Sequence, residues 1–107
     1  MARQRSVLVV DRSEETQEVL RTVLERRGVR TLAASAKQRG LELAARYRPD
    51  LIVLDLELED SSPEEVFRPF ARQAQAFRTP MVLLGDRRRE SQCLLQGQFV
   101  AKPYHYG

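Results

Sequence analysis

The stretch from Pro49 to Asp55 constrains the fold of this chain more than any other part of it. Its apolar residues, 51–54, form a short continuous run and do not alternate with polar residues. Such a run is typical of a strand buried on both faces, as in the middle of a parallel sheet. Pro49 suits the position before the strand, where its missing N–H costs least. The run ends in Asp55, and open α/β sheets bind their ligands beyond the carboxyl ends of their strands.

Four further segments predict the rest of a sheet. The run at residues 7–10 resembles the central one and also ends in an aspartate, Asp11. Residues 29–34, 81–84 and 99–101 are the other predicted strands. The fourth of the five strands closes at Gly85, and the last is followed by Lys102 and Pro103.

Helical patterns separate these strands. Ser13 is a candidate N-cap with acidic residues in the first turn after it, and Gly28 is expected to end that helix. Ser35 is the candidate cap of a second helix, which ends before Pro49. Gly40 is expected to weaken this second helix by about 1 kcal/mol relative to Ala.

The third helix has the clearest start. Ser62 is the expected cap, Pro63 the first helical residue, and Glu65 lies three residues after the cap. Pro69 falls inside the helix and is expected to kink it. One apolar stripe predicts its core face: Val66, Phe67, Phe70, Ala71, Ala74 and Phe77. A short helix over residues 89–95 is expected before the last strand.

Alternation of strands and helices predicts an α/β fold, a flavodoxin-like doubly wound five-stranded parallel sheet in the order 2-1-3-4-5. In that order the first and third strands are neighbours, so Asp11 and Asp55 should converge at one edge. Lys102, at the end of the fifth strand, should reach the same crevice. The chain stops where a last helix would be expected.

Composition limits the alternatives. The 107 residues suit one domain. The single cysteine, Cys93, allows no internal disulfide and favours a cytoplasmic location, and no apolar run is long enough for a membrane span. The net charge of +3 comes from arginines scattered along the chain. The one compact basic run, residues 87–89, is expected to be solvated, so direct nucleic-acid binding is not expected.

The predicted cluster has a definite chemical use. Carboxylate oxygens hold Mg²⁺, which keeps several waters and binds phosphoryl groups. A lysine offers a point charge to phosphate oxygens, and an aspartate can accept a phosphoryl group as an acyl phosphate.

The chain resembles the receiver domain of two-component response regulators. The matching stretches, in order, are residues 7–11, 49–56, 80–84 and 102–104. The resemblance implies that Asp55 is the phosphoacceptor, that Asp11 is an acid of the metal pocket and that Lys102 contacts the phosphoryl group. It also implies a cis peptide bond between Lys102 and Pro103.

Several positions depart from the receiver pattern. Receivers usually carry two adjacent acids after the first strand, but the second is Arg12 here. Gly85 stands where a Thr or Ser hydroxyl usually senses the phosphoryl group, whereas the aromatic switch residue is kept as Phe99. The segment between Gly85 and Lys102 is several residues short, and the final helix is absent from this sequence.

Each departure leaves alternatives open. Arg12 either pairs with Asp11 or Asp55 in the place of the metal, or turns to solvent and leaves a weak Mg²⁺ site. Glu57 is either a replacement metal ligand or a solvated loop acid. Asp11, Asp55 and Lys102 are either a phosphoryl site or a structural salt-bridge cluster.

We expect a single receiver-like domain over residues 1–107, the N-terminal part of a longer protein with an output domain. It is not expected to be an enzyme. The leading hypothesis is slow phosphoryl acceptance on Asp55, and the alternative is a pseudo-receiver that acts only through protein binding. A phosphatase that uses Asp55 and Glu57 is a third hypothesis. A histidine kinase or other signalling protein is the expected partner, and the uncovered face beside Val19 and Val23 also suggests a homodimer.

Overall fold

The computed structural model describes residues 3–85 and 98–101, with side chains for residues 3–85. Five parallel strands form one sheet in the order β2-β1-β3-β4-β5, as predicted. Their bounds are β1 Ser6–Val10, β2 Arg30–Ala34, β3 Leu51–Asp55, β4 Met81–Gly85 and β5 Gln98–Ala101. The helices are α1 Glu14–Arg26, α2 Lys37–Tyr47 and α3 Pro63–Phe77. The flavodoxin-like prediction is therefore confirmed.

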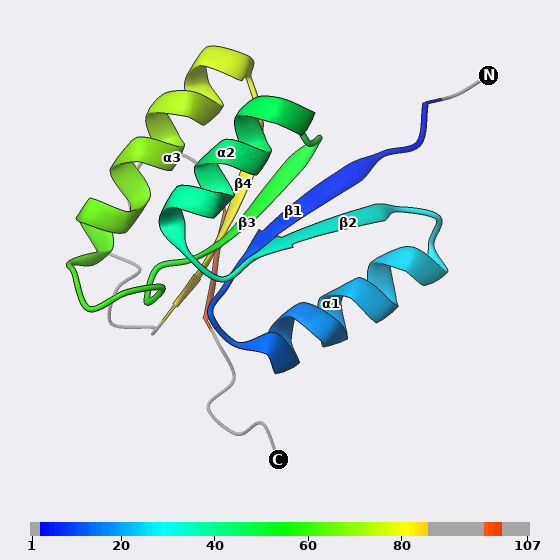
Figure 1. Ribbon diagram of the computed structural model, residues 1–107, viewed down its shortest axis with the longest axis horizontal. Coiled ribbons are helices and arrows are strands. Elements are labelled where there is room, and N and C mark those ends of the chain that lie inside the picture. Colours follow the sequence, from blue (N-terminus) through cyan, green and yellow to red (C-terminus); the bar gives the residue numbers. More distant parts are fainter. Residues whose placement is uncertain (1–2, 86–97, 102–107) are drawn as a thin grey trace.

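The helices lie in two layers (Figure 1). α2 and α3 cover one face of the sheet, and the larger core lies beneath them around Leu8, Leu54 and Phe70. α1 lies on the opposite face over a smaller cluster that contains Val7, Val9 and Val53. The central strands are thus buried on both sides, as their unbroken apolar runs predicted.

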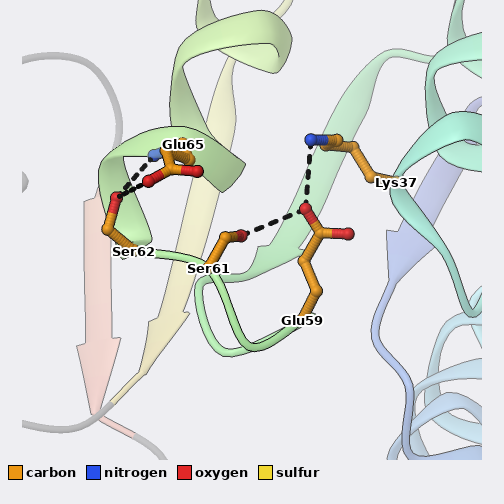
Figure 2. A network of polar contacts seen from close by, with 5 residues as sticks. All are labelled: Lys37, Glu59, Ser61, Ser62 and Glu65. Atoms are coloured by element: carbon orange, nitrogen blue, oxygen red, sulfur yellow. Dashed lines mark hydrogen bonds and ion pairs between the residues drawn. The ribbon is translucent and has the colours of Figure 1, made fainter.

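The predicted starts of α1 and α3 are confirmed. The Ser13 hydroxyl accepts from Thr16 N–H at 3.2 Å. The Ser62 hydroxyl accepts from Glu65 N–H at 3.2 Å and donates to the Glu65 carboxylate at 3.2 Å (Figure 2). Pro69 does lie inside α3.

The predicted cap of α2 is wrong. The N-cap is Ala36, whose side chain makes no capping bond. The Ser35 hydroxyl instead accepts from the Gln17 side chain of α1 at 3.0 Å. The Ser35 hydroxyl, which the sequence predicted to cap α2, therefore joins α1 to the end of β2.

Gly40 allows close packing between α2 and its neighbours, a role that helix propensity alone does not predict. A Cβ at this position would lie 2.9 Å from Phe70 Cζ and 3.0 Å from Val10 Cγ2. Both neighbours are fully buried, so neither has room to move. Glycine lets α2 approach β1 and α3 more closely than any other residue would.

The apolar stripe of α3 does not remain in the core to its end. Val66, Phe70 and Ala74 are buried, but Phe77 is 36% exposed, so its predicted core position is wrong. Phe77 is the last residue of α3, and the Arg48 guanidinium carbon lies 4.3 Å from the centroid of its ring. The last residue of the stripe therefore lies outside the core, with the Arg48 guanidinium over its ring.

Candidate functional site

Asp11 and Asp55 leave the sheet at the same edge. Val10 of β1 lies beside Leu54 of β3, and each aspartate is the next residue along its strand. The Asp11 residue is 0% exposed and Asp55 is 2% exposed. The structure thus brings together the two carboxylates that the sequence predicted to converge, at the topological switch point of the sheet.

Backbone donors orient both carboxylates. Ser13 N–H donates to Asp11 Oδ1 at 2.8 Å, and Glu57 N–H donates to Asp55 Oδ1 at 2.9 Å. In each case the donor lies two residues after the aspartate, where the chain turns out of the strand. Hydrogen bonds from backbone N–H groups to the carboxylate oxygens fix the orientation of each side chain. The turn chemistry after each strand therefore positions the acid that ends it.

Gln17 ties the start of α1 to the same edge. Its side-chain amide donates to the backbone carbonyl of Asp11 and to the Ser35 hydroxyl. The contact joins the ends of β1 and β2 to one residue of the helix. Sequence reasoning missed this role because a glutamine inside a helix is usually solvated.

The loop after β3 is anchored by apolar side chains and carries acids outward. Leu56 and Leu58 are buried, whereas Asp60 is exposed. Leu56 N–H continues the ladder by donating to the Leu84 carbonyl at 2.8 Å. A hollow of about 400 Å³ opens over this loop, lined by Arg12, Leu56, Glu57, Glu59, Asp60 and Ser61.

A salt bridge holds the outer part of this loop against α2. Figure 2 shows Glu59 between Lys37 and Ser61, with Lys37 Nζ at 3.0 Å and Ser61 Oγ at 3.1 Å from Glu59 Oε1. The bond from Lys37, followed by that from Ser61, lowers the pKa of Glu59 below its ordinary value. In a parallel sheet, crossover helices begin at the edge where the strands end. Lys37 is the first residue of α2, so its position in the sequence could have predicted that it lies near the loop after β3.

Arg12 lies at the rim of the hollow. Its side chain is 59% exposed, and Nη1 is 3.9 Å from Asp60 Oδ1. This is the solvent-facing arrangement of the two that the sequence left open. A cation therefore stands directly after Asp11 in the chain, at the position where receivers usually carry a second acid.

The end of β4 contributes no side chain to the edge. Leu84 pairs with Asp55, and Gly85, the next residue, is buried. Glycine offers neither a hydroxyl nor a methyl group there. Gly85, which lacks the hydroxyl that usually senses the phosphoryl group, therefore lies one residue beyond the partner of Asp55 in the sheet.

Some predicted features lie outside the described residues. Lys102, its bond to Pro103, Cys93, residues 87–89 and the short helix over residues 89–95 are among them. Phe99 is described only as backbone, in β5 beside Leu83. Their predicted roles stay predictions.

Two buried carboxylates at one edge suit a hard cation such as Mg²⁺, which takes oxygen ligands. Within residues 3–85, however, no three acidic, histidine or cysteine side chains lie close enough together to hold a metal. Asp11 and Asp55 therefore stay the predicted metal ligands, and this structure does not gather Glu57 with them as a third.

Comparison with known proteins agrees with this geometry. The response regulator receiver domain family matches residues 7–104 of the chain. The chain belongs to the response regulator receiver family. This receiver is 36% identical over 107 residues to the KDP operon transcriptional regulatory protein KdpE of Escherichia coli, a match that covers 95% of this chain and 46% of KdpE. It is 35% identical over 82 residues to the transcriptional regulatory protein AfsQ1 of Streptomyces coelicolor, over 77% of this chain and 35% of AfsQ1.

Solved structures show the same fold. The receiver superimposes on the chemotaxis response regulator CheY4 of Vibrio cholerae with a TM-score of 0.81 at 20% identity, covering 96% of this chain and 90% of CheY4. The receiver spans about half the length, or less, of the curated relatives named here. No helix among the described residues is long and apolar enough to cross a membrane.

Proposed function

We propose that this receiver accepts a phosphoryl group on Asp55, slowly and with weak help from Mg²⁺. The observation that carries the proposal is Arg12, which directly follows Asp11 and whose guanidinium lies 3.9 Å from Asp60 in the hollow over the loop after β3. A positive charge near a divalent cation site repels the cation. The acceptor is present, and the metal that assists transfer is disfavoured.

The nucleophile is well placed for this chemistry. The Asp55 carboxylate lies at the end of a central strand, buried and oriented by the Glu57 N–H bond. An ionised carboxylate in that position can attack phosphorus and form an acyl phosphate. Mg²⁺, when held by Asp11 and Asp55, would neutralise charge on the incoming phosphoryl group. Lys102 would add a second positive charge, by resemblance to other receivers.

Coupling of phosphate to the surface is expected to be weak. A switch requires a ligand that interacts differently with two states of the protein. In receivers the usual sensor is a hydroxyl at the end of β4, and Gly85 has none. A phosphoryl group on Asp55 would therefore change the surface around β4 and β5 only slightly.

The second candidate function is a pseudo-receiver that binds partners without phosphate control. The same two residues, Arg12 and Gly85, favour it, since both remove parts of the phosphate machinery. In that case the buried aspartates act as a structural cluster. Signalling would then depend on docking alone.

The partner we propose is a histidine kinase or another signalling protein. Val19 and Val23 lie one turn apart on α1 and are 51% and 46% exposed, as predicted. An exposed apolar pair on the outer side of α1 suits docking of a partner helix or of a second copy. An output segment linked to this receiver is part of the proposal, because KdpE and AfsQ1 are about twice as long or longer.

Labelling with acetyl phosphate in Mg²⁺ tests the proposal. We expect slow incorporation in the unaltered protein and none in Asp55→Asn. Rapid stoichiometric labelling would contradict the weak metal site. Absence of labelling, even at high Mg²⁺, would favour the pseudo-receiver. Steady-state release of phosphate from a model ester would instead indicate the phosphatase, which we do not expect.

A further inference from the structure

Arginines that are far apart in the sequence gather at the edge where the strands begin. Arg30 is the first residue of β2, Arg46 and Arg48 flank the end of α2, and Arg78 follows the end of α3. Crossover helices in a parallel sheet all end on the side where the strands start, as α2 and α3 do in Figure 1. This side lies opposite the aspartate pair. We call Arg30, Arg46, Tyr47, Arg48, Phe77 and Arg78 the arginine edge.

Residues 3–85 do not neutralise the positive charge of the arginine edge through ion pairs. All four arginines are exposed, and none forms an ion pair with any residue of the described part of the chain. Asp50, the acid that precedes β3, is already engaged by Arg3 and by Ser6 N–H. The edge therefore presents a coherent positive field to solvent.

Two exposed aromatic rings lie among these cations. The guanidinium carbons of Arg30 and Arg46 lie 5.6 Å and 5.4 Å from the Tyr47 ring centroid. Arg48 lies over Phe77 in the same way and connects the ends of α2 and α3. Guanidinium groups stacked on exposed rings form flat platforms on which further planar groups can stack.

Helix stabilisation does not account for this arrangement. Cations near helix ends complement the helix dipole, which explains Arg46. Arg30, however, belongs to a strand. Arg48 and Arg78 adopt left-handed backbone conformations with φ of 44° and 56°, where glycine is the favoured residue. Two helix ends thus carry an arginine at a position where glycine would be less strained.

A hollow of about 300 Å³ opens beside Tyr47. Arg3, Gln4, Ser6, Arg30, Leu32 and Tyr47 line it. It combines a ring face, a guanidinium and polar side chains in one concave surface. Those are the groups that hold an unpaired base by its ring face and its polar edges.

We propose that the arginine edge binds single-stranded nucleic acid, with phosphates on the guanidinium groups and unpaired bases on Tyr47 and Phe77. The fork of donors on arginine matches phosphate oxygens, and the exposed rings favour unstacked bases over a duplex or an acidic peptide. The sequence suggested scattered charge and no such interface. The edge is remote from Asp55, so the binding is independent of phosphoryl acceptance.

Fluorescence anisotropy of a labelled oligothymidylate measures the interaction. Affinity should fall with salt, with a log–log slope of about −0.7 per phosphate contact, or about −3 for four arginines. Arg46→Gln with Arg48→Gln should weaken binding about tenfold or more. Arg68→Gln with Arg72→Gln removes the same charge from exposed positions of α3 and should change affinity less than about twofold.

Two further variants separate binding from folding. Arg48→Gly removes the guanidinium and relieves the left-handed backbone, so it should lose affinity without loss of thermal stability. Tyr47→Ser with Phe77→Ser removes the rings and should weaken the single strand several-fold. The proposal would be overturned by an equal loss of affinity in the Arg68→Gln with Arg72→Gln control. It would also be overturned if a duplex bound more tightly than the single strand, or if polyglutamate bound equally tightly. The last result would indicate an acidic protein segment as the ligand.

Discussion

Arg12 Nη1 lies 3.9 Å from Asp60 Oδ1, across the mouth of the hollow over the loop that follows β3. The guanidinium therefore faces solvent and the loop after β3. Arg12 is the residue that departs most from the receiver pattern, and its partner Asp60 is a loop acid to which the sequence assigned no role.

Arg12→Asp should tighten Mg²⁺ binding and speed labelling of Asp55. A charge pair about 4 Å apart is worth about 4 kcal/mol at an effective dielectric of 20. Because Arg12 is exposed, we expect only part of that, about 1.4 kcal/mol or tenfold in the Mg²⁺ dissociation constant. Arg12→Gln, which removes only the repulsion, should give a smaller gain. Titration of Mg²⁺ by NMR measures both variants, and equal affinities for all three proteins would contradict the role given to Arg12.

Gly85→Thr alone should neither tighten Mg²⁺ nor speed labelling, because a neutral hydroxyl supplies no metal ligand charge. Combined with Arg12→Asp, it should restore a conformational response to phosphorylation. Amide spectra of β4 with and without acetyl phosphate provide the readout. A clear response in the unaltered protein would show that Gly85 does not disable the switch.

The exposed valines of α1 should support self-association of this chain. Val23→Lys places a charge in the apolar patch and should weaken association about tenfold, equivalent to about 1.4 kcal/mol. Thr22→Lys adds the same charge at the neighbouring exposed position and serves as the matched control. Sedimentation over a range of concentrations distinguishes the variants. A protein that stays monomeric at high concentration would contradict this prediction.

Gly40→Ala should destabilise the fold although alanine is the better helix former. The gain in helix propensity is about 1 kcal/mol, and overpacking costs about 1–3 kcal/mol. The added methyl group would clash with Phe70 Cζ and with Val10. We expect a net loss of about 1 kcal/mol in urea unfolding. Phe70→Leu in the same background should recover part of it, and a non-interacting double-mutant cycle would be inconsistent with the clash.

Glu59 should titrate below the ordinary range of a glutamate. Lys37 and then Ser61 lower its pKa, so the interaction is present above the unfolded pKa and is lost as pH falls through the folded pKa. Because the Glu59 side chain is 39% exposed, solvent screens the pair, and its loss should open the loop locally and leave global stability unchanged. Lys37→Met should raise the pKa of Glu59 more than Ser61→Ala does. Carboxyl carbon shifts measure this, and a pKa of Glu59 unchanged by Lys37→Met would refute it.

The sequence by itself determined the elements and the predicted site chemistry, because these depend on neighbours along the chain. An unbroken apolar run before Asp55 predicts a central strand, and Ser62, Pro63 and Glu65 predict a helix start from local capping bonds. The convergence of Asp11 with Asp55 also followed, since strand order fixes which carboxyl ends are adjacent.

Only the tertiary structure decided the relations between distant residues. The close approach of Gly40 to Phe70, the diversion of the Ser35 hydroxyl to Gln17 and the exposure of Phe77 depend on how helices pack on the sheet. The arginine edge is the clearest case. Arg30, Arg48 and Arg78 are separated by many residues, yet a parallel sheet places strand starts and helix ends on one side. Charge that is scattered along the chain becomes a single surface because distance in space, and not in sequence, sets the electrostatic field.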